Sequence, residues 1–130
     1  MKNGIIFSML LCLILACAKK EGSKILSPQQ FKNQIVNETE TYQILDLRTD
    51  EEVAQGMVPT AEQLDYLEEK FDAKLKKLDK NKTYYIYCRS GNRSGKAMAL
   101  MTELGFEKVY DMQGGMQAWE SAGMEIEMPK

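Results

Sequence analysis

Hydrophobic residues follow two spacings along this chain, and together they predict strands that alternate with helices. Three short segments are rich in β-forming residues and read as strands: Tyr42–Leu47, Thr83–Tyr87 and Lys108–Met112. In Thr83–Tyr87 these side chains stand at consecutive positions without polar alternation, as expected of a central strand covered on both faces. Amphipathic segments lie between the strands. The pattern predicts an α/β fold with a mostly parallel sheet and helices on both faces.

Local capping signals predict where the first two helices begin. Ser27 is followed by Pro28 and Gln30, which fit an N-cap, a first-turn proline and a capping box. Thr49 or Asp50 can cap a second, short helix.

Three further helices are predicted from apolar spacing. One is a long amphipathic helix whose apolar residues recur every three or four positions: Leu64, Leu67, Phe71, Leu75 and Leu78. The next covers Ser94–Leu104, and Gly105 is a natural C-terminal stop. The last follows Gly114-Gly115 and contains Trp119. In such folds, sites form at the carboxyl ends of parallel strands.

The N-terminus reads as an export signal. In Met1–Ala16 a positive start precedes the apolar run Ile5–Leu15, which is too short to span a bilayer. The run ends at Ile14-Leu15-Ala16-Cys17, which resembles a bacterial lipobox. The resemblance implies a signal peptide over residues 1–16, an acylated (palmitate-bearing) Cys17 and a tether over residues 17–24. The domain at 25–130 would then be a lipoprotein of the bacterial cell envelope, facing the periplasm or the cell exterior. The alternative is a cleaved signal peptide with an incidental cysteine.

The charge balance and the absence of histidine exclude several function classes. The chain has 17 basic and 19 acidic residues and a formal net charge of −2, so no overall field favours nucleic acid. Without histidine there is no His-based zinc site, no Ser-His-Asp or Cys-His catalysis and no imidazole proton shuttle. We therefore expect no metal, no cofactor and no nucleic-acid partner, and a monomeric domain.

Cys88 is the candidate nucleophile. Of the three cysteines, Cys12 and Cys17 lie in the export segment, so Cys88 is the one thiol expected in the folded domain. It lies between a predicted strand and a predicted helix, at the start of a tight loop that contains Gly91. Backbone N–H groups of such a loop can point inward and hold an anion, which lowers the pKa of a thiol.

The candidate substrate-binding residues follow Cys88 directly. They are Arg89, Ser90, Gly91, Asn92 and Arg93, and the two arginines can add positive charge for an oxyanion substrate. This set favours a nucleophile that attacks a sulfur donor and keeps the transferred sulfur as a persulfide. Asp46 and Arg48 fit a structural ion pair or a capping group, and Glu52 fits a scaffold residue that makes hydrogen bonds.

The chain resembles single-domain rhodaneses, which are sulfurtransferases. The resemblance covers about Ile25–Met124 and rests on five segments in order: Asp46-Leu47-Arg48, Glu51-Glu52, Gly56-Met57-Val58-Pro59-Thr60-Ala61, Tyr87 to Ser94, and Gly114-Gly115-Met116-Gln117-Ala118-Trp119. It implies a rhodanese-like α/β fold with a central five-stranded sheet. It also implies a Cys88 persulfide cradled by the backbone amides of Arg89–Arg93, thiosulfate or a persulfide as donor, and a thiol or cyanide as acceptor.

One segment departs from the family, and two other functions stay open. The family usually has Gly-His-Ile-x-Gly-Ala where this chain has Gly56-Met57-Val58-Pro59-Thr60-Ala61. A phosphatase or arsenate reductase of this fold type would have Cys-x5-Arg, whereas the chain has Cys88-x4-Arg93. The second of these other functions is a non-catalytic binding module of the envelope.

Overall fold

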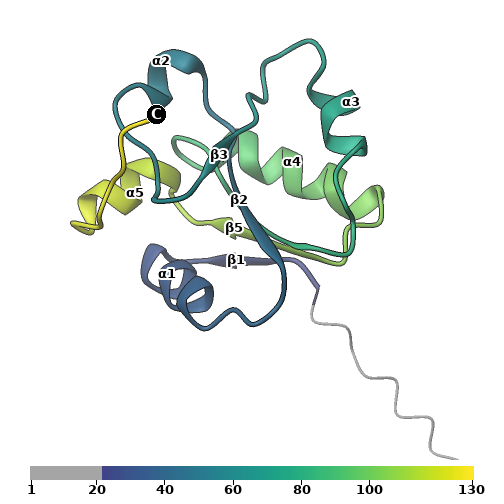
Figure 1. Ribbon diagram of the computed structural model, residues 1–130, viewed down its shortest axis with the longest axis horizontal. Coiled ribbons are helices and arrows are strands. Elements are labelled where there is room, and N and C mark those ends of the chain that lie inside the picture. The colour runs from purple at the N-terminus through teal and green to yellow at the C-terminus, as the bar shows by residue number, and fades with distance from the viewer. Residues whose placement is uncertain (1–21) are drawn as a thin grey trace, which may run out of the picture.

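The computed structural model describes residues 22–130, and in this part a five-stranded parallel sheet lies between two layers of helices (Figure 1). The predicted signal peptide and Cys17 lie outside the described residues. The strand order is β1-β5-β4-β2-β3. The strands are β1 (Lys24–Leu26), β2 (Tyr42–Asp46), β3 (Glu62–Gln63), β4 (Thr83–Tyr87) and β5 (Lys108–Met112).

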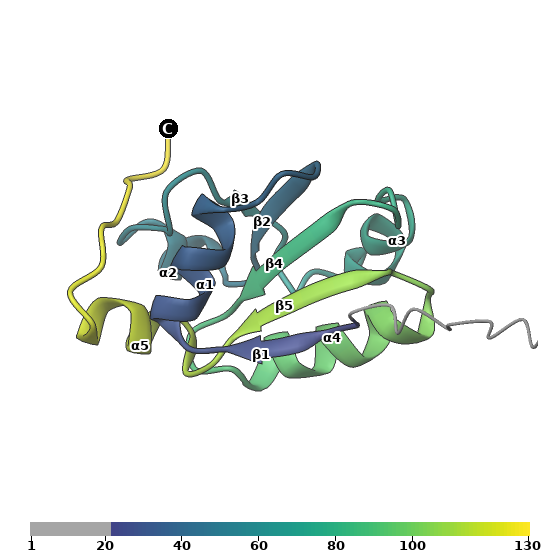
Figure 2. The ribbon, with the colours of Figure 1, turned by 90° about the horizontal axis from the view of Figure 1, so that it is seen from below.

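Helices cover both faces of the sheet, as the sequence predicts (Figure 2). They are α1 (Pro28–Val36), α2 (Asp50–Val53), α3 (Phe71–Lys76), α4 (Asn92–Glu103) and α5 (Gly115–Ser121). The core contacts place α1 and α5 on one face and α3 and α4 on the other. No helix within residues 22–130 is long and apolar enough to cross a membrane.

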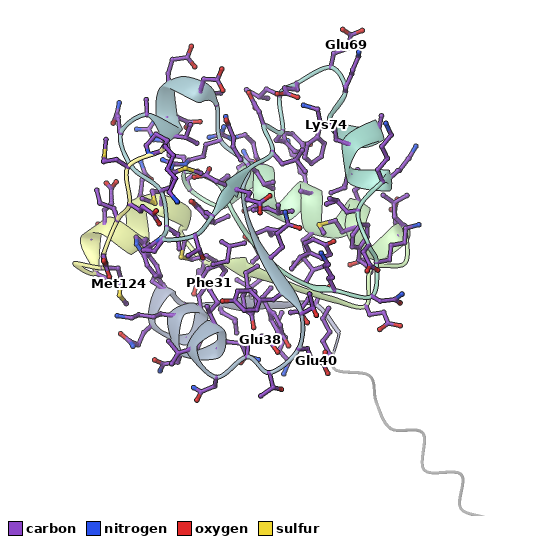
Figure 3. All side chains as sticks on the ribbon, in the orientation of Figure 1. Phe31, Glu38, Glu40, Glu69, Lys74 and Met124 are labelled. Atoms are coloured by element: carbon purple, nitrogen blue, oxygen red, sulfur yellow. The ribbon has the colours of Figure 1, made fainter. Side chains whose placement is uncertain are left out.

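Strand β4 lies at the centre of the sheet, and all of its residues are buried. Its side chains alternate between the two core layers. Tyr84 and Ile86 face the α3 and α4 layer, as does Cys88 just beyond the strand. Tyr85 and Tyr87 face the α1 and α5 layer, where Phe31 of α1 meets the Tyr85 ring edge to face at 5.4 Å. Figure 3 shows the Phe31 side chain between α1 and the sheet.

Both predicted caps form. Ser27 donates its N–H to Gln30 Oε1 at 3.0 Å, and its hydroxyl oxygen accepts the Gln30 N–H at 3.2 Å. Thr49 and Glu52 make the same reciprocal pair at the start of α2. Each cap satisfies backbone groups that a helix terminus leaves unpaired, so the local sequence determines where both helices start.

The long helix predicted over Leu64–Leu78 is wrong. Only α3, Phe71–Lys76, is helical there. Before it, Leu64 donates its N–H to Asp46 O at 2.8 Å and Tyr66 donates to Leu47 O at 3.1 Å. These bonds and the pairing of β3 with β2 hold the backbone of this segment against the end of β2, and tertiary hydrogen bonding overrides local helical spacing.

Three smaller boundaries also differ from the prediction. Lys24, assigned to the tether, belongs to β1, a strand that was not predicted and that pairs in parallel with β5. Strand β3 was not predicted, because two residues are too short for a periodic signal. Helix α4 begins at Asn92 rather than Ser94, inside the loop that follows Cys88.

Candidate functional site

Cys88 lies at the carboxyl end of β4, and its sulfur is enclosed by the loop that follows. The residue is 1% exposed. The Gly91 N–H donates to Cys88 Sγ at 3.1 Å, and Ser94 Oγ lies within hydrogen-bond distance of Sγ at 3.4 Å. The chain turns back over the sulfur because Gly91, the N-cap of α4, adopts φ +104°, a region that favours glycine.

The loop lowers the pKa of the Cys88 thiol. Burial by itself raises this pKa, because it disfavours the charged thiolate. Hydrogen bonds from the Ser94 hydroxyl and from the backbone N–H groups of Ser94, Gly91 and Ser90 outweigh that effect. The resemblance to rhodaneses implies such a cradle over Arg89–Arg93. In the structure, backbone N–H groups of Ser90, Gly91 and Ser94 face the sulfur, and the Gly91 contact measures 3.1 Å.

Helix α5 fixes the first two residues of the loop from the other side. Met116 donates its N–H to Cys88 O at 2.8 Å, and Gln117 donates to Arg89 O at 3.0 Å. Gly115 lies so close that a Cβ there would stand 2.4 Å from Cys88 O. The glycine at position 115 therefore permits the backbone contact that holds the cysteine loop.

Arg93 forms an ion pair rather than pointing freely at the loop. Its two terminal nitrogens donate to Glu52 Oε2 at 2.8 Å and Oε1 at 2.7 Å. Arg93 and the hydrogen bonds from Thr49 hold the pKa of Glu52 down at about 2. This bidentate pair joins α2 to α4 across the site. Glu52 accepts hydrogen bonds from Arg93 and Thr49, which is the supporting role predicted for it.

Arg89 borders an open pocket beside the loop. The pocket has a volume of about 390 Å³, and its lining includes charged side chains of both signs. The lining residues are Arg48, Glu51, Glu52, Gln55, Arg89, Met116, Gln117 and Glu120. Asn92, in contrast, is an exposed first residue of α4.

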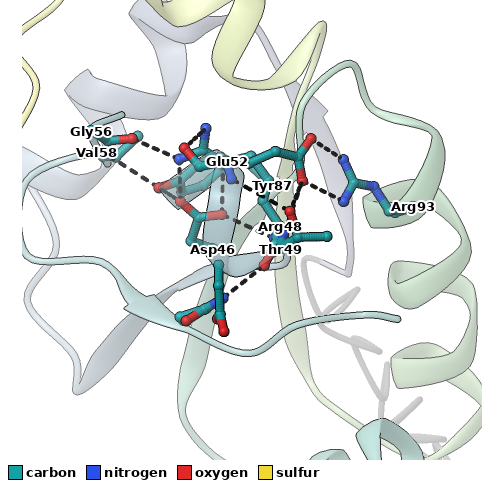
Figure 4. A network of polar contacts seen from close by, with 10 residues as sticks. Asp46, Arg48, Thr49, Glu52, Gly56, Val58, Tyr87 and Arg93 are labelled. Atoms are coloured by element: carbon teal, nitrogen blue, oxygen red, sulfur yellow. Dashed lines mark hydrogen bonds and ion pairs between the residues drawn. The ribbon is translucent and has the colours of Figure 1, made fainter. Parts of the chain in front are cut away.

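The predicted ion pair of Asp46 and Arg48 forms and is buried (Figure 4). Asp46 Oδ2 accepts from Arg48 Nη2 at 2.7 Å and from the Tyr87 hydroxyl at 2.5 Å, and the same Nη2 donates to Gly56 O at 2.7 Å. The Tyr87 oxygen in turn accepts the Val58 N–H at 3.1 Å. This network connects β2, β4 and the 56–58 segment beneath the site.

The segment that departs from the family motif is held by hydrogen bonds to the C-terminal segment. Thr60, where the family has glycine, adopts φ +66°, and its N–H donates to a Glu127 carboxylate oxygen at 2.9 Å. Met57, in place of the usual histidine, exchanges backbone hydrogen bonds with Glu127, both at 2.8 Å. The C-terminal segment thus supports a turn that lacks its usual glycine.

Sequence reasoning did not single out Asp111. This aspartate lies in β5 and is 3% exposed, and the Ser94 hydroxyl beside its carboxyl group lowers its pKa. The available signal was an acidic residue at a position of a strand predicted to be buried. Ser94 was read only as the start of a helix, yet it touches Cys88 Sγ. Within residues 22–130, no group of three or more His, Cys, Asp or Glu side chains could hold a metal ion.

Residues 27–122 match the family model described as Rhodanese-like domain. The chain belongs to the rhodanese-like family. A sulfurtransferase of Allochromatium vinosum is 36% identical over 98 residues, which cover 75% of this chain and 90% of that protein. A putative sulfurtransferase of Bacillus subtilis, YtwF, is 40% identical over 97 residues with the same coverage.

Solved rhodanese-like structures share the fold. The rhodanese-like domain protein of Staphylococcus aureus superposes with a TM-score of 0.68 at 32% identity, covering 82% of this chain and 99% of that one. A rhodanese-related protein of Thermoplasma volcanium gives a TM-score of 0.71 at 24% identity, with the same coverage, and supports the fold alone. The predicted rhodanese-like α/β fold is confirmed.

Proposed function

We propose that this rhodanese-like protein is a sulfurtransferase that moves sulfane sulfur through a persulfide on Cys88. The donor is thiosulfate or another persulfide, and the acceptor is a thiol or cyanide. The supporting observation is the Cys88 sulfur itself, which accepts the Gly91 N–H at 3.1 Å and contacts the Ser94 hydroxyl at 3.4 Å. The names of the relatives, sulfurtransferases, agree with this class of reaction.

The reaction with thiosulfate takes two steps. The Cys88 thiolate attacks the outer sulfur, a new S–S bond forms, the bond within thiosulfate breaks, and sulfite leaves with the electron pair. The acceptor then attacks the outer sulfur of the persulfide, and the thiolate is released. Hydrogen bonds from the loop amides stabilise anionic sulfur in both states, without a metal. Because Cys88 is 1% exposed, the enclosed site favours a small donor.

The position of Arg93 argues against phosphatase or arsenate reductase activity. In such an enzyme, the loop arginine would bind the tetrahedral oxyanion. Here both terminal nitrogens of Arg93 are bonded to Glu52, at 2.7 and 2.8 Å. The alternative of a non-catalytic binding module would leave the lowered pKa of the Cys88 thiol without a use.

Incubation with thiosulfate, followed by mass spectrometry of the intact domain, tests the proposal. We expect the mass of one additional sulfur atom per chain, located on Cys88, and loss of the adduct together with thiosulfate:cyanide activity in Cys88→Ser. The variant's thermal unfolding serves as the control for folding. Transfer activity that survives in Cys88→Ser would remove Cys88 from the mechanism, and phosphate release by the unaltered protein would favour the phosphatase alternative.

We also propose that the domain is carried on the bacterial cell envelope by lipidated Cys17. The basis is the sequence, where an apolar run stops at Ala16-Cys17 and a polar tether follows. Multiple acyl chains give stable anchoring where a single chain would be marginal. In the full chain, Cys17→Ala should leave the protein unprocessed or release it from the membrane fraction. A processed, membrane-bound Cys17→Ala protein would contradict the anchor.

A further inference from the structure

A buried carboxyl group lies on the same side of the sheet as the candidate nucleophile. Asp111 of β5 is paired in register with Ile86 of β4. Because side chains alternate along a strand, Asp111 shares the α4 side with Val109, and Cys88 lies on that side too. Asp111 is 3% exposed, and its Oδ1 has no hydrogen-bond partner among the described residues. A buried carboxyl group with an unsatisfied oxygen carries a desolvation penalty that needs an explanation.

Ser94 connects the carboxyl group to the sulfur. Its hydroxyl lies beside the Asp111 carboxyl group and lowers the pKa of that group, and its Oγ lies 3.4 Å from Cys88 Sγ. Ser94 is fully buried, in the first turn of α4. A hydroxyl group has one proton to donate and lone pairs to accept, so Ser94 can accept from the thiol while it donates to the carboxylate.

We propose that Asp111 accepts the proton of the Cys88 thiol through the Ser94 hydroxyl. The S–H bond breaks as its proton joins Ser94 Oγ, and the original hydroxyl proton of Ser94 moves to a carboxylate oxygen of Asp111. A thiol and a carboxylate thereby become a thiolate and a carboxylic acid, and the net charge stays −1. In this product state the acid donates to Ser94, and Ser94 donates to the thiolate.

The environment of Asp111 suits this role in a chain without histidine. Burial raises the pKa of Asp111 to about 6, against the opposing hydrogen bonds of the Ser94 hydroxyl and the Met112 N–H. A carboxylate with that pKa can hold a proton close to neutral pH. The lowered pKa of the Cys88 thiol brings the two groups nearer in proton affinity.

Other titratable groups on the elements around Asp111 are engaged elsewhere or exposed. On the α4 side, Arg93 is bonded to Glu52, and Lys96 is exposed. On β4, the Tyr84 hydroxyl donates to the backbone oxygen of Asp79 at 2.8 Å. On β1, Lys24 is exposed. Cys88 is thus the titratable group that Ser94 links to Asp111.

The pH dependence of Cys88 alkylation by iodoacetamide tests the relay. Two coupled groups lose their protons in two macroscopic steps, so the alkylation rate of the unaltered protein should rise in two steps. In Asp111→Asn the neutral amide imitates the protonated acid, so a single step should remain. A coupling of about one pKa unit would make alkylation of this variant about tenfold faster between the two steps. A single step in the unaltered protein would overturn the proposal.

A second set of variants separates the relay from a direct effect of charge. Ser94→Ala should also give a single step, and Asp111→Asn should then change nothing further. An undiminished effect of Asp111→Asn in the Ser94→Ala background would overturn the relay through Ser94. Glu103→Gln, which removes an exposed carboxylate of α4, is the matched control and should keep both steps.

Infrared spectroscopy of the unaltered protein gives a readout that does not depend on any variant being folded. Between the two alkylation steps, the C=O stretch of a protonated carboxylic acid should be present together with thiolate. Absence of that band would contradict the proton transfer. The catalytic role of this relay rests on the proposed sulfur transfer. The alkylation experiment tests the relay separately, because it needs no sulfur donor. Two alkylation steps without any persulfide would refute sulfur transfer and leave the relay standing.

Discussion

At the scale of single residues, the site depends on one glycine that lies outside the cysteine loop. Gly115 adopts φ +57°, and its Cα lies against the Cys88 carbonyl, which accepts the Met116 N–H at 2.8 Å. A Cβ at this position would meet backbone atoms at 2.4 and 2.6 Å, and backbone atoms cannot turn aside as a side chain can. The residue therefore permits close contact between α5 and the loop that holds the nucleophile.

We predict that Gly115→Ala lowers the free energy of unfolding by about 2–4 kcal/mol, the sum of left-handed backbone strain and overpacking. Persulfide formation in the fraction that remains folded should slow by about tenfold or more, because the loop must move. Gly123→Ala is the matched control: its φ is +69°, but nothing lies within 4 Å of the added Cβ. Denaturant titration and single-turnover kinetics measure both effects. Equal losses in the two variants would show that the close contact is unimportant.

At the scale of elements, the buried Asp46–Arg48 pair fixes the end of β2 relative to β4 and the 56–58 segment. Asp46 accepts from the Arg48 backbone N–H and Nε on one oxygen and from Arg48 Nη2 and the Tyr87 hydroxyl on the other. Both charged residues are almost fully buried. Tyr87 directly precedes Cys88, so this network also supports the strand end that presents the sulfur.

We predict that Asp46→Asn destabilises the domain by about 3–5 kcal/mol, because Arg48 would be left buried without its opposite charge. The new amide group would also face two donors, Arg48 Nη2 and the Tyr87 hydroxyl. Chemical denaturation measures the loss. Glu51→Gln, an exposed change in α2, should alter stability by less than about 0.5 kcal/mol. A loss of similar size in both variants would mean that the buried pair contributes little.

At the scale of the whole molecule, two carboxyl groups should make folding stability depend on pH in opposite directions. The pKa of Glu52 is lowered from 4.5 to about 2 in the folded state. Its contribution is therefore complete above pH 4.5 and is lost as the pH falls towards 2. The pKa of Asp111 is raised from 3.8 to about 6. The folded state thus holds the extra proton between these values, and stability decreases as the pH rises through them.

We predict that Asp111→Asn stabilises the domain most above pH 6 and has a shrinking effect as the pH falls towards 3.8. Glu52→Gln should destabilise the domain above pH 4.5 and become neutral near pH 2. Unfolding free energies measured across pH 2–8 test both variants, and each serves as a control because their windows differ. A pH-independent difference between Asp111→Asn and the unaltered protein would show that Asp111 titrates normally.

The amino-acid sequence by itself determined the features that depend on neighbouring residues. The capping box at Ser27 forms as predicted, and Thr49, one of two predicted caps, starts α2, because these hydrogen bonds span only three residues. The strand Thr83–Tyr87 has the predicted bounds, since a run of β-formers without alternation is a strong local signal of a buried strand. The cysteine loop, with Gly91 in a left-handed conformation, also follows from local chemistry.

Tertiary structure alone decided the features that join distant segments. The backbone N–H groups of Leu64 and Tyr66 donate to carbonyl oxygens at the end of β2, and the helix predicted from Leu64 does not form. Arg93 forms an ion pair with Glu52, which lies 41 positions away in the sequence, and this pair connects α4 to α2. Asp111 and Cys88 share one side of the sheet because β5 pairs with β4. No local pattern encodes such meetings, since they depend on strand order and on which face of the sheet each helix covers.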